Sequence, residues 1–412
     1  MTPGAEQKPF VVDATGQSLS YRELCARLAA DQSFRPVCHA RGAAEIFYQV
    51  ALALSRGRRL LLVDPELKPH ELEQLGLDRD APVEQLASMP IADVAALVER
   101  CRTSEGFELE LLTSGSTGLP KRVVHRLAGL TRFLRTSPRH RDDVWGLCYN
   151  PTHIAGVQVF LQAFLNANAM IDLFGQSPGT IQQRIVGHGV THLSATPTFY
   201  RLLLADVREP LPQVRAITLG GEASDPALHA RLREVFPNAR ITNLYASTEA
   251  GTLFASDGDT FFPAEGIAKL IAIEQGTLRL HRSLLGEFQG AADASEWYDT
   301  GDKVEIVATE PLRFRFVGRE RDWINLGGEK VNPQEVEALL LQFPGVTAAR
   351  VFGRKNSVVG QILCAEVVAT GARDETALRD FLAARLHAIK VPRLISFVSA
   401  LPSSRTGKLL RS

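Results

Sequence analysis

Strand-like and helix-like patterns alternate along most of this chain, and this alternation limits the possible folds more than any other feature. Residues 58–65, 214–224 and 239–251 are short apolar strands that each run into a polar turn. Residues 18–31 begin with a serine cap and continue with apolar side chains at helical spacing. Alternation of this kind predicts an α/β architecture, in which ligands bind in loops at the strand ends.

Two later segments, residues 276–282 and 303–319, alternate apolar and polar side chains with a period of two. This is the period of a strand with one buried face. Neighbouring segments of this kind commonly pair as antiparallel strands. We therefore expect an antiparallel region to follow the α/β part of the chain.

The pattern changes again near residues 319–322, where we place a domain boundary. A helix is predicted shortly afterwards, because Asn332 can cap it, Pro333 suits its first turn and Glu335 stands three residues after the cap. A βαβ-like stretch follows this helix. The predicted domains, one large and one small, are residues 1–318 and 319–412.

Length and composition argue against several classes of protein. A chain of 412 residues exceeds one ordinary core, so we expect more than one domain. Basic and acidic residues number 46 each, which argues against a dedicated nucleic-acid binder. No signal peptide is visible, and the longest apolar segment, residues 157–174, is too polar for a membrane span. The five cysteines are scattered without a Cys-x-x-Cys pair, which fits a reducing cytoplasm rather than a disulfide framework or a zinc site.

The most informative loop lies in residues 111–125, whose sequence is LLTSGSTGLPKRVVH. Its glycines let backbone N–H groups point at a ligand, its hydroxyls add donors, and Lys121 adds a positive charge, all of which suit a phosphate. A flexible glycine- and serine-rich linker has a similar composition. The strand-like flanks, 108–112 and 123–124, argue against a linker, and the lack of Gly-Lys-Ser/Thr excludes a P-loop. The loop alone leaves the phosphate site and the linker open.

Further polar stretches stand next to predicted strands. GGEAS at 220–224 and NLYASTEAG at 243–251 follow strands, YDTGD at 298–302 precedes one, and SSRTGKLLR occupies 403–411. These stretches, taken together with three others, resemble in their order along the chain the motifs of the adenylate-forming superfamily. The three others are LSYREL near the start, the loop TSGSTGLPKR, and GRERDWINLGGEKVNPQEVE at 318–337. That superfamily includes acyl- and aryl-CoA ligases, adenylation domains of nonribosomal peptide synthetases, and luciferases. The ordered motifs cover nearly the whole chain, which makes the resemblance highly specific.

The resemblance implies both a fold and a reaction. The fold would be a large N-terminal domain of several subdomains with a small α+β lid domain. The enzyme would use ATP and Mg²⁺ to convert a small-molecule carboxylic acid to an acyl-adenylate, and would then pass the acyl group to a thiol. CoA is the favoured thiol, and phosphopantetheine on a separate acyl carrier protein is the alternative. A catalytically inactive nucleotide-binding protein is the alternative from another class.

The resemblance also implies roles for residues around the phosphates. Thr248 would donate to the α-phosphate, and Glu249 would hold Mg²⁺ through oxygen. Lys408, on the lid, would be a catalytic residue that bridges the reacting carboxylate and the α-phosphate. The alternative is a solvated surface lysine, as most lysines are. The surrounding motif favours the catalytic role. The residues that would hold the β- and γ-phosphates are Thr113, Ser114, Gly115, Ser116, Thr117, Gly118 and Lys121.

For the nucleoside, the resemblance implies a second group of residues. Tyr245 would stack on adenine, with Gly221 and Glu222 beside it. Asp302 would accept hydrogen bonds from the two ribose hydroxyls, as a single carboxylate can do. Arg319 would support the ribose as well.

The acid would bind near residues 149–165. Amino-acid-activating relatives have a Phe-Asp pair here, whose carboxylate binds the substrate ammonium, whereas this chain has Thr152-His153 and no acidic residue before Asp172. An α-amino acid is therefore disfavoured, and an aryl or acyl acid is expected. His153 resembles the gating residue of acyl- and aryl-CoA ligases; a buried structural histidine is the alternative. The other expected pocket residues are Gly156, Val157 and Thr196.

The lid would rotate between the two half-reactions and bring a glycine-rich segment to the thiol. Gly327 and Gly328 would line the thiol tunnel. The hinge candidates are Glu320, Arg321 and Asp322. Arg321 stands where the family usually has the Asp or Lys pivot, so the pivot residue is left open. Arg122 replaces the usual glycine of the phosphate loop. It is either a second phosphate charge or a solvated side chain, and we favour the solvated side chain.

Overall fold

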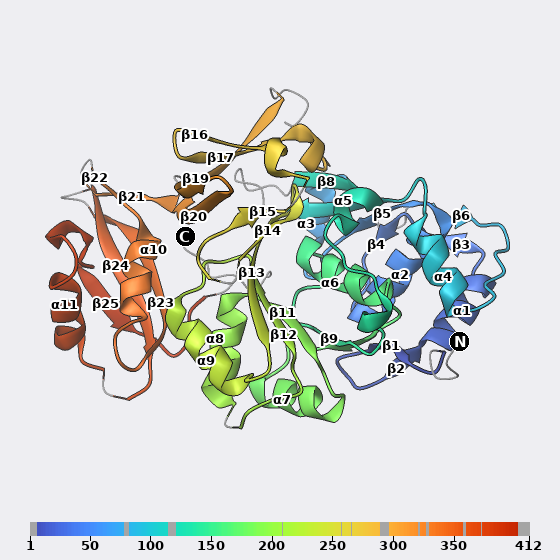
Figure 1. Cartoon of the computed structure of the whole chain (residues 1–412), viewed down its shortest axis with the longest axis horizontal. Helices are drawn as coiled ribbons and strands as arrows, with labels where there is room; N and C mark the ends of the chain where they lie inside the picture. Colours follow the sequence, from blue (N-terminus) through green and yellow to red (C-terminus); the bar gives the residue numbers. More distant parts are fainter. Residues whose placement is uncertain are drawn as a thin grey trace.

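The computed structural model describes residues 6–77, 82–113, 121–207, 209–256, 258–264, 266–288, 296–319, 322–326, 329–356, 360–371 and 373–402. Helices and strands alternate through most of these residues, which confirms the predicted α/β class. Figure 1 shows the C-terminal part, from β21 (Ile324–Leu326) onward, at one end of the molecule and the N-terminal helices at the other. Within the described residues, no helix has the length and apolar character that crossing a bilayer requires.

The large sheet has a parallel centre and antiparallel edges. Its strands lie in the order β15-β14-β13-β12-β11-β9-β10-β1-β2, and the strands from β13 to β1 run parallel. Neighbouring residues in β1, β10 and β11 are buried on both faces, as is usual for parallel sheets covered by helices. The bounds are β1 Pro9–Val12, β2 Ser18–Ser20, β9 Val144–Leu147, β10 Ala169–Asp172, β11 His192–Ala195, β12 Ala216–Gly220, β13 Arg240–Ser247, β14 Gly251–Ser256 and β15 Phe262–Pro263.

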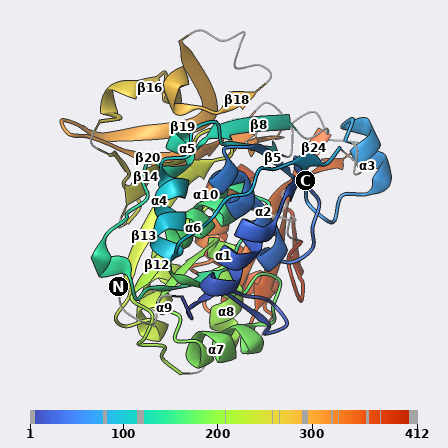
Figure 2. The same cartoon turned by 90° about the vertical axis from the view of Figure 1, so that its right-hand side faces the viewer.

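Helices α7, α8 and α9 form one core with the large sheet and lie together at the bottom of Figures 1 and 2. Each begins in the same way, with a side-chain oxygen as N-cap and a proline in the first turn. The caps are Ser177, Thr196 and Asp225. The bounds are α7 Pro178–Gly187, α8 Pro197–Asp206 and α9 Pro226–Val235.

A second sheet has the order β18-β8-β7-β5-β4. The core between it and the large sheet contains helices α1, α2, α4 and α6, and the rings of Phe47 and Phe160 stack there with centroids 4.4 Å apart. The first helix has a serine cap, as predicted, but the cap is Ser20 rather than the first residue of the segment 18–31, because residues 18–20 form β2; Ser20 makes a capping box with Glu23. The bounds are α1 Tyr21–Ala30, β4 Val37–Cys38, α2 Ala43–Arg56, β5 Arg59–Leu62, α4 Val94–Arg102, β7 Glu108–Thr113, β8 Lys121–Arg126, α6 Ile154–Phe164 and β18 Glu287–Phe288.

The third sheet is antiparallel, in the order β16-β17-β19-β20, which confirms the prediction from the period-two pattern. It lies at the top of Figures 1 and 2, on the side away from α7 to α9. Residues 298–302 were expected to precede a strand, but they lie inside β19. The strand continues through them because Gly301 takes a positive φ of 70° while Asp299 and Lys303 keep their partners on β17. The bounds are β16 Ile271–Glu274, β17 Thr277–His281, β19 Trp297–Thr309 and β20 Leu312–Arg319.

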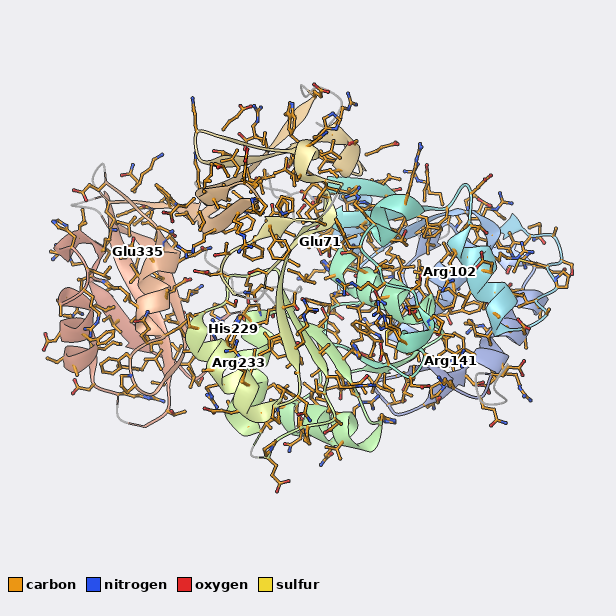
Figure 3. All side chains as sticks on the ribbon, in the orientation of Figure 1. Glu71, Arg102, Arg141, His229, Arg233 and Glu335 are labelled. Carbon is orange, nitrogen blue, oxygen red and sulfur yellow. The ribbon has the colours of Figure 1, made fainter. Side chains whose placement is uncertain are left out.

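The C-terminal part has its own core, formed by residues between Ile324 and Phe397. Its helix α10 begins as predicted, with Asn332 as N-cap, but the Glu335 carboxylate is engaged by Lys390 Nζ at 2.7 and 2.8 Å. In Figure 3, Glu335 marks this part, His229 and Arg233 mark α9, and Arg102 lies toward the opposite end. The bounds are β22 Glu329–Val331, α10 Pro333–Leu340, β23 Val346–Asn356, β24 Gly360–Ala369, α11 Glu375–Ala383 and β25 Leu394–Phe397.

Short elements connect these layers. They are β3 Ser33–Phe34, α3 Pro69–Gln74, β6 Glu84–Gln85, α5 Leu127–Thr131 and the 3-10 helices Pro138–His140, Ala268–Leu270, Arg282–Leu284 and Ala388–Lys390.

Candidate active site

Loops at one edge of the large sheet carry many of the predicted site residues. Strands β9, β11, β12 and β13 are neighbours and run parallel, so their carboxyl ends meet at the same edge. The segment with His153 follows β9, Thr196 follows β11, Gly221 follows β12 and Thr248 follows β13. Open α/β sheets bind ligands at this edge. The topology therefore gathers segments that are far apart in the sequence.

Thr248 and Glu249 lie in the tight hairpin between β13 and β14. Ser247 pairs with Gly251 across the hairpin, and Gly251 has the positive φ, 67°, that a three-residue hairpin loop favours. The Ala250 N–H donates to the Ser247 hydroxyl at 3.2 Å. In the part of the chain that the structure describes, no hydrogen bond or ion pair engages the Glu249 carboxylate.

Two carbonyl groups of this hairpin receive hydrogen bonds from the second sheet. The Thr248 carbonyl oxygen lies 2.7 Å from Nε2 of His125, and the Glu249 carbonyl accepts from the Gly286 N–H at 2.7 Å. Because a carbonyl only accepts, Nε2 of His125 carries the proton. Burial lowers the pKa of the His125 imidazole, while the Thr248 carbonyl and the Glu249 charge act in the opposite direction. The ring is therefore neutral near pH 7.

Asp302 is the centre of a buried polar group that joins the large sheet to the third sheet. The Tyr245 hydroxyl donates to its Oδ2 at 2.6 Å, and Arg319 donates to Oδ1 from Nε at 2.6 Å and to Oδ2 from Nη2 at 3.3 Å. Burial, and then the Asp302 charge, raise the pKa of Tyr245 well above its ordinary value. Burial lowers the pKa of Arg319, but the bonds and charge of Asp302 outweigh it and raise that pKa overall. Tyr245 is therefore neutral and Arg319 charged near neutral pH.

The Tyr245 ring is held by other aromatic rings. It stacks on Phe316 with centroids 4.5 Å apart and an angle of 11°, and it is tilted against Phe254 at 5.4 Å. An adenine that stacked on Tyr245 would meet a ring whose position is already fixed.

Gly221 and Glu222 form the turn after β12, where Gly221 has a φ of 84°. The Glu222 carboxylate accepts from the Thr198 N–H at 3.0 Å and from the Thr198 hydroxyl at 2.7 Å, in the first turn of α8. The Thr196 hydroxyl accepts from the Phe199 N–H at 3.1 Å in the same turn. Both side chains thus hold the start of α8 at the edge of the sheet, and their predicted ligand contacts remain predictions.

The strands predicted on either side of the phosphate loop are confirmed. Strand β7 ends at Thr113 and β8 begins at Lys121, and these two residues are partners in the antiparallel ladder. The segment between them therefore starts and ends at neighbouring positions, unlike a linker between domains. The predicted site and hinge residues outside the described part of the chain are Ser114, Gly115, Ser116, Thr117, Gly118, Glu320, Arg321, Gly327, Gly328 and Lys408.

Arg122 is not the merely solvated side chain that we favoured from the sequence. Its Nη1 lies 3.4 Å from Oε1 of Glu110, and its Nη2 donates to the Leu75 carbonyl at 2.5 Å. Glu110 is only 4% exposed and also accepts from Arg59 Nη2 at 2.8 Å. A buried carboxylate needs such counter-charges. Arg122 therefore pairs with Glu110 at the base of the phosphate loop.

The predicted acid side contains a carboxylate that comes from another strand. Nε2 of His153 lies 3.8 Å from Oδ2 of Asp64, which follows β5. Asn150 Nδ2 donates to the same oxygen at 3.3 Å, and the Glu66 N–H donates to Oδ1 at 2.9 Å. Asn150 in turn accepts from the Thr152 N–H and hydroxyl at 2.9 and 2.8 Å. Although this segment of the sequence contains no acidic residue, the fold therefore brings the carboxylate of Asp64 next to it.

The apolar residues predicted for the acid pocket are tightly packed. A Cβ built at Gly156 would collide with the Asn150 carbonyl, so glycine allows α6 to start against this loop. Val157 is fully buried in the core between the two sheets. Their predicted contacts with substrate remain predictions.

Sequence reasoning missed His125, Asp64 and Asn150. Each is a polar residue within or just after an apolar strand, and a buried position of that kind requires a hydrogen-bonding partner. That pattern could have marked them as structurally important, although it could not have named their partners.

Comparison with known proteins shows which family this chain is similar to. The chain matches the AMP-binding enzyme family over residues 110–269 and the AMP-binding enzyme C-terminal domain over residues 335–408. It is 30% identical to the 2-succinylbenzoate–CoA ligase of Geobacillus kaustophilus, over 86% of this chain and 77% of that protein. It is 28% identical to the p-hydroxybenzoic acid–AMP ligase of Mycobacterium tuberculosis, over 88% of this chain and 59% of that protein.

Solved structures share the fold. The o-succinylbenzoate CoA synthetase of Bacillus subtilis, in complex with its acyl-adenylate, superposes with a TM-score of 0.72 at 21% identity, over all of this chain and 95% of that one. The anthranilate CoA ligase in complex with anthranoyl-AMP superposes with a TM-score of 0.74 at 18% identity, over 99% of this chain and 93% of that one. The chain belongs to the AMP-binding enzymes of the adenylate-forming superfamily, as an AMP-forming acid–thiol ligase similar to the acyl- and aryl-CoA ligases.

Proposed function

We propose that this enzyme activates an aryl or apolar acyl carboxylic acid with ATP and transfers the acyl group to CoA. The observation that carries the proposal is the meeting of the segments around His153, Thr196, Gly221 and Thr248 at one edge of the large sheet. The relatives with this fold include enzymes named as CoA ligases and structures in complex with acyl-adenylates.

The nucleoside would bind beside Asp302. A carboxylate has about four lone-pair sites, and Tyr245 and Arg319 supply three donors to Asp302, so acceptor capacity remains for a ribose hydroxyl. The adenine would stack on the ring of Tyr245, beside the turn at Gly221. Arg319 would hold the Asp302 carboxylate in place.

The chemistry of Glu249 fits a magnesium ion. Its carboxylate has no protein partner among the described residues, and Mg²⁺ commonly takes one or two carboxylates together with substrate phosphates. The residues that the structure describes contain no cluster of three or more His, Cys, Asp or Glu side chains that could hold a metal by itself. Bound Mg²⁺ would neutralise charge on the phosphates. Glu249 would hold it at the hairpin next to Thr248.

The reaction would proceed in two steps. A substrate carboxylate oxygen forms a bond to the α-phosphorus while the bond to pyrophosphate breaks; Thr248 donates to the α-phosphate, and Lys408 supplies a positive charge. Thr113, Lys121 and the loop between them hold the β- and γ-phosphates. The thiolate of CoA then attacks the acyl carbon, and AMP leaves. Positioning and electrostatic stabilisation would provide most of the catalysis.

We propose a division into an N-terminal domain, 1–318, and a lid, 319–412, that changes position between the steps. The separate core of residues 324–397 supports the division. Gly327 and Gly328 would line the path of the thiol, and the pivot would lie in residues 320–322. An acyl carrier protein is the alternative thiol partner. The five cysteines are free, which is compatible with the cytoplasm as the place of action.

The acid class is proposed from residues around His153. The Asp64 carboxylate nearby accepts hydrogen bonds from Asn150 and from the Glu66 N–H and lies 3.8 Å from His153 Nε2, so these protein groups would compete with a substrate ammonium for it. We therefore expect benzoates, cinnamates or fatty acids rather than α-amino acids.

Exchange of labelled pyrophosphate into ATP, measured with a panel of these acids and of α-amino acids, tests the proposal. Exchange should require both an acid and Mg²⁺, and addition of EDTA should abolish it. Thioester formation with CoA should follow for the best acid. Exchange with an α-amino acid and with none of the other acids would show that the proposed acid class is wrong.

A further inference from the structure

We propose, on the basis of the function above, that His125 is a positioning residue for adenylation that acts through the Thr248–Glu249 hairpin. His125 lies on β8 in the second sheet, whereas the hairpin joins two strands of the large sheet. It is 3% exposed, so its ring belongs to the interior. The hydrogen bond from His125 Nε2 to the Thr248 carbonyl, 2.7 Å long, therefore joins the two sheets at the site.

Two hydrogen bonds from the second sheet hold the Thr248–Glu249 hairpin. Besides the bond from His125, the Gly286 N–H donates to the next carbonyl, that of Glu249, at 2.7 Å. Gly286 directly precedes β18, and β18 pairs with β8 through Glu287 and Val124. Both donors thus come from one edge of the second sheet, and they hold two successive peptide groups of the hairpin.

The His125 ring is confined in this position. A Cβ built at Gly286 would lie 2.9 Å from Cε1 of His125 and 2.7 Å from the Val124 carbonyl oxygen. Such spacing means that the Gly286 backbone lies directly against the ring and the strand. The imidazole therefore has little room to turn its Nε2–H away from Thr248.

This arrangement links the two phosphate-binding elements. Strand β8 begins at Lys121, at the end of the phosphate loop, and carries His125 farther along. The hairpin carries Thr248 and Glu249, which would contact the α-phosphate and Mg²⁺. Outer-shell hydrogen bonds orient the groups that touch a metal, and their loss typically lowers metal affinity or activity about 10–100-fold. His125 would thus set where the Glu249 carboxylate stands relative to the phosphate loop.

The test measures how much Mg²⁺ improves ATP binding, and it needs no knowledge of the acid. ATP is titrated calorimetrically into the full-length wild type and into His125→Leu, each in excess Mg²⁺ and in EDTA. The wild type should bind ATP more tightly with Mg²⁺. The gain is the ratio of the ATP affinity in excess Mg²⁺ to the ATP affinity in EDTA. In His125→Leu, which keeps the bulk of the side chain but has no hydrogen-bond donor, this ratio should fall at least about tenfold. The ATP affinity in EDTA should change less than about threefold.

Two further variants separate positioning from general stability. His125→Gln retains an amide N–H at a similar reach and should restore most of the gain. His192→Leu removes a partly buried histidine, at the start of β11, and should keep the full gain even if its melting temperature falls. A His125→Leu protein that keeps the full gain, or a His125→Gln protein that loses as much as His125→Leu, would overturn the role of His125. A wild type without any gain would overturn the Glu249 metal site as well.

Discussion

The proposed nucleotide side and the proposed acid side of this site differ in how the predicted residues are held. On the nucleotide side, Asp302 receives direct hydrogen bonds from Tyr245 and Arg319, all within 3.3 Å. On the acid side, the Asp64 carboxylate also accepts hydrogen bonds from Asn150 and the Glu66 N–H, but the predicted substrate residue His153 lies 3.8 Å from it, and the predicted pocket residue Val157 is completely enclosed by the core.

This difference explains why the reaction is easier to infer than the substrate. Charged and hydrogen-bonding groups must be particular residue types, so they leave short motifs such as YDTGD in the sequence. An apolar pocket accepts many residue types and is defined by how segments pack together. The nucleotide side is therefore common to a family, whereas the acid side needs measurements on this enzyme.

The largest effect is expected from Lys408, the residue that would serve both sides. Lys408→Ala should slow adenylate formation by about 10²–10³, because a preorganised donor to the transition state is worth about 3–4 kcal/mol. ATP binding should stay near normal, since other residues hold the nucleotide. Acid-dependent pyrophosphate exchange measures the rate, and calorimetry measures the binding. Exchange at the wild-type rate would remove Lys408 from the mechanism.

A smaller effect, confined to the nucleotide side, is expected from Asp302→Asn. The amide keeps the shape of the carboxylate but loses the charge that Arg319 faces at 2.6 Å. Hydrogen bonds to charged groups contribute about 1.5–3 kcal/mol, so ATP affinity should fall about 10–100-fold. The KM for the acid should change little. If the KM for the acid rose while ATP affinity stayed the same, the division of the site into two sides would be wrong.

Much of the fold could be predicted because its signals are local. Helix caps are short-range patterns: the cap at Asn332 is confirmed, and the first helix is capped by a serine, Ser20, two residues after the start of the predicted segment. The strands flanking the phosphate loop could be read in the same way from their apolar residues. In contrast, the pairing of Asp302 with Tyr245 depends on how the third sheet packs on the large sheet.

Contacts between sheets account for what the sequence did not reveal. His125 meets Thr248, and Asp64 meets His153, across the boundary between the second sheet and the large sheet. Such contacts depend on the twist and separation of whole sheets, which no local pattern encodes. Arg122 differs from these, because its partner Glu110 lies in the same sheet; the two become neighbours through the antiparallel pairing of β7 with β8.

The smallest effect, and the sharpest test of the acid side, is expected from Asp64→Asn. The amide can keep a hydrogen bond with Asn150, but the negative charge facing His153 is lost. An exposed ion pair contributes about 0.2–1 kcal/mol, and a 3.8 Å contact between a carboxylate and a histidine contributes no more than that, so the KM for the best acid should rise up to about fivefold. The KM for ATP should stay the same, because Asn150, the Glu66 N–H and His153, which contact Asp64, are not among the proposed nucleotide residues. A double-mutant cycle decides whether the effect passes through His153: Asp64→Asn should have no further effect on acid KM in a His153→Gln background. Equal effects of Asp64→Asn in both backgrounds would mean that the Asp64 carboxylate acts on the acid without His153. The acid side would then depend on a direct contact of a carboxylate, as the nucleotide side does.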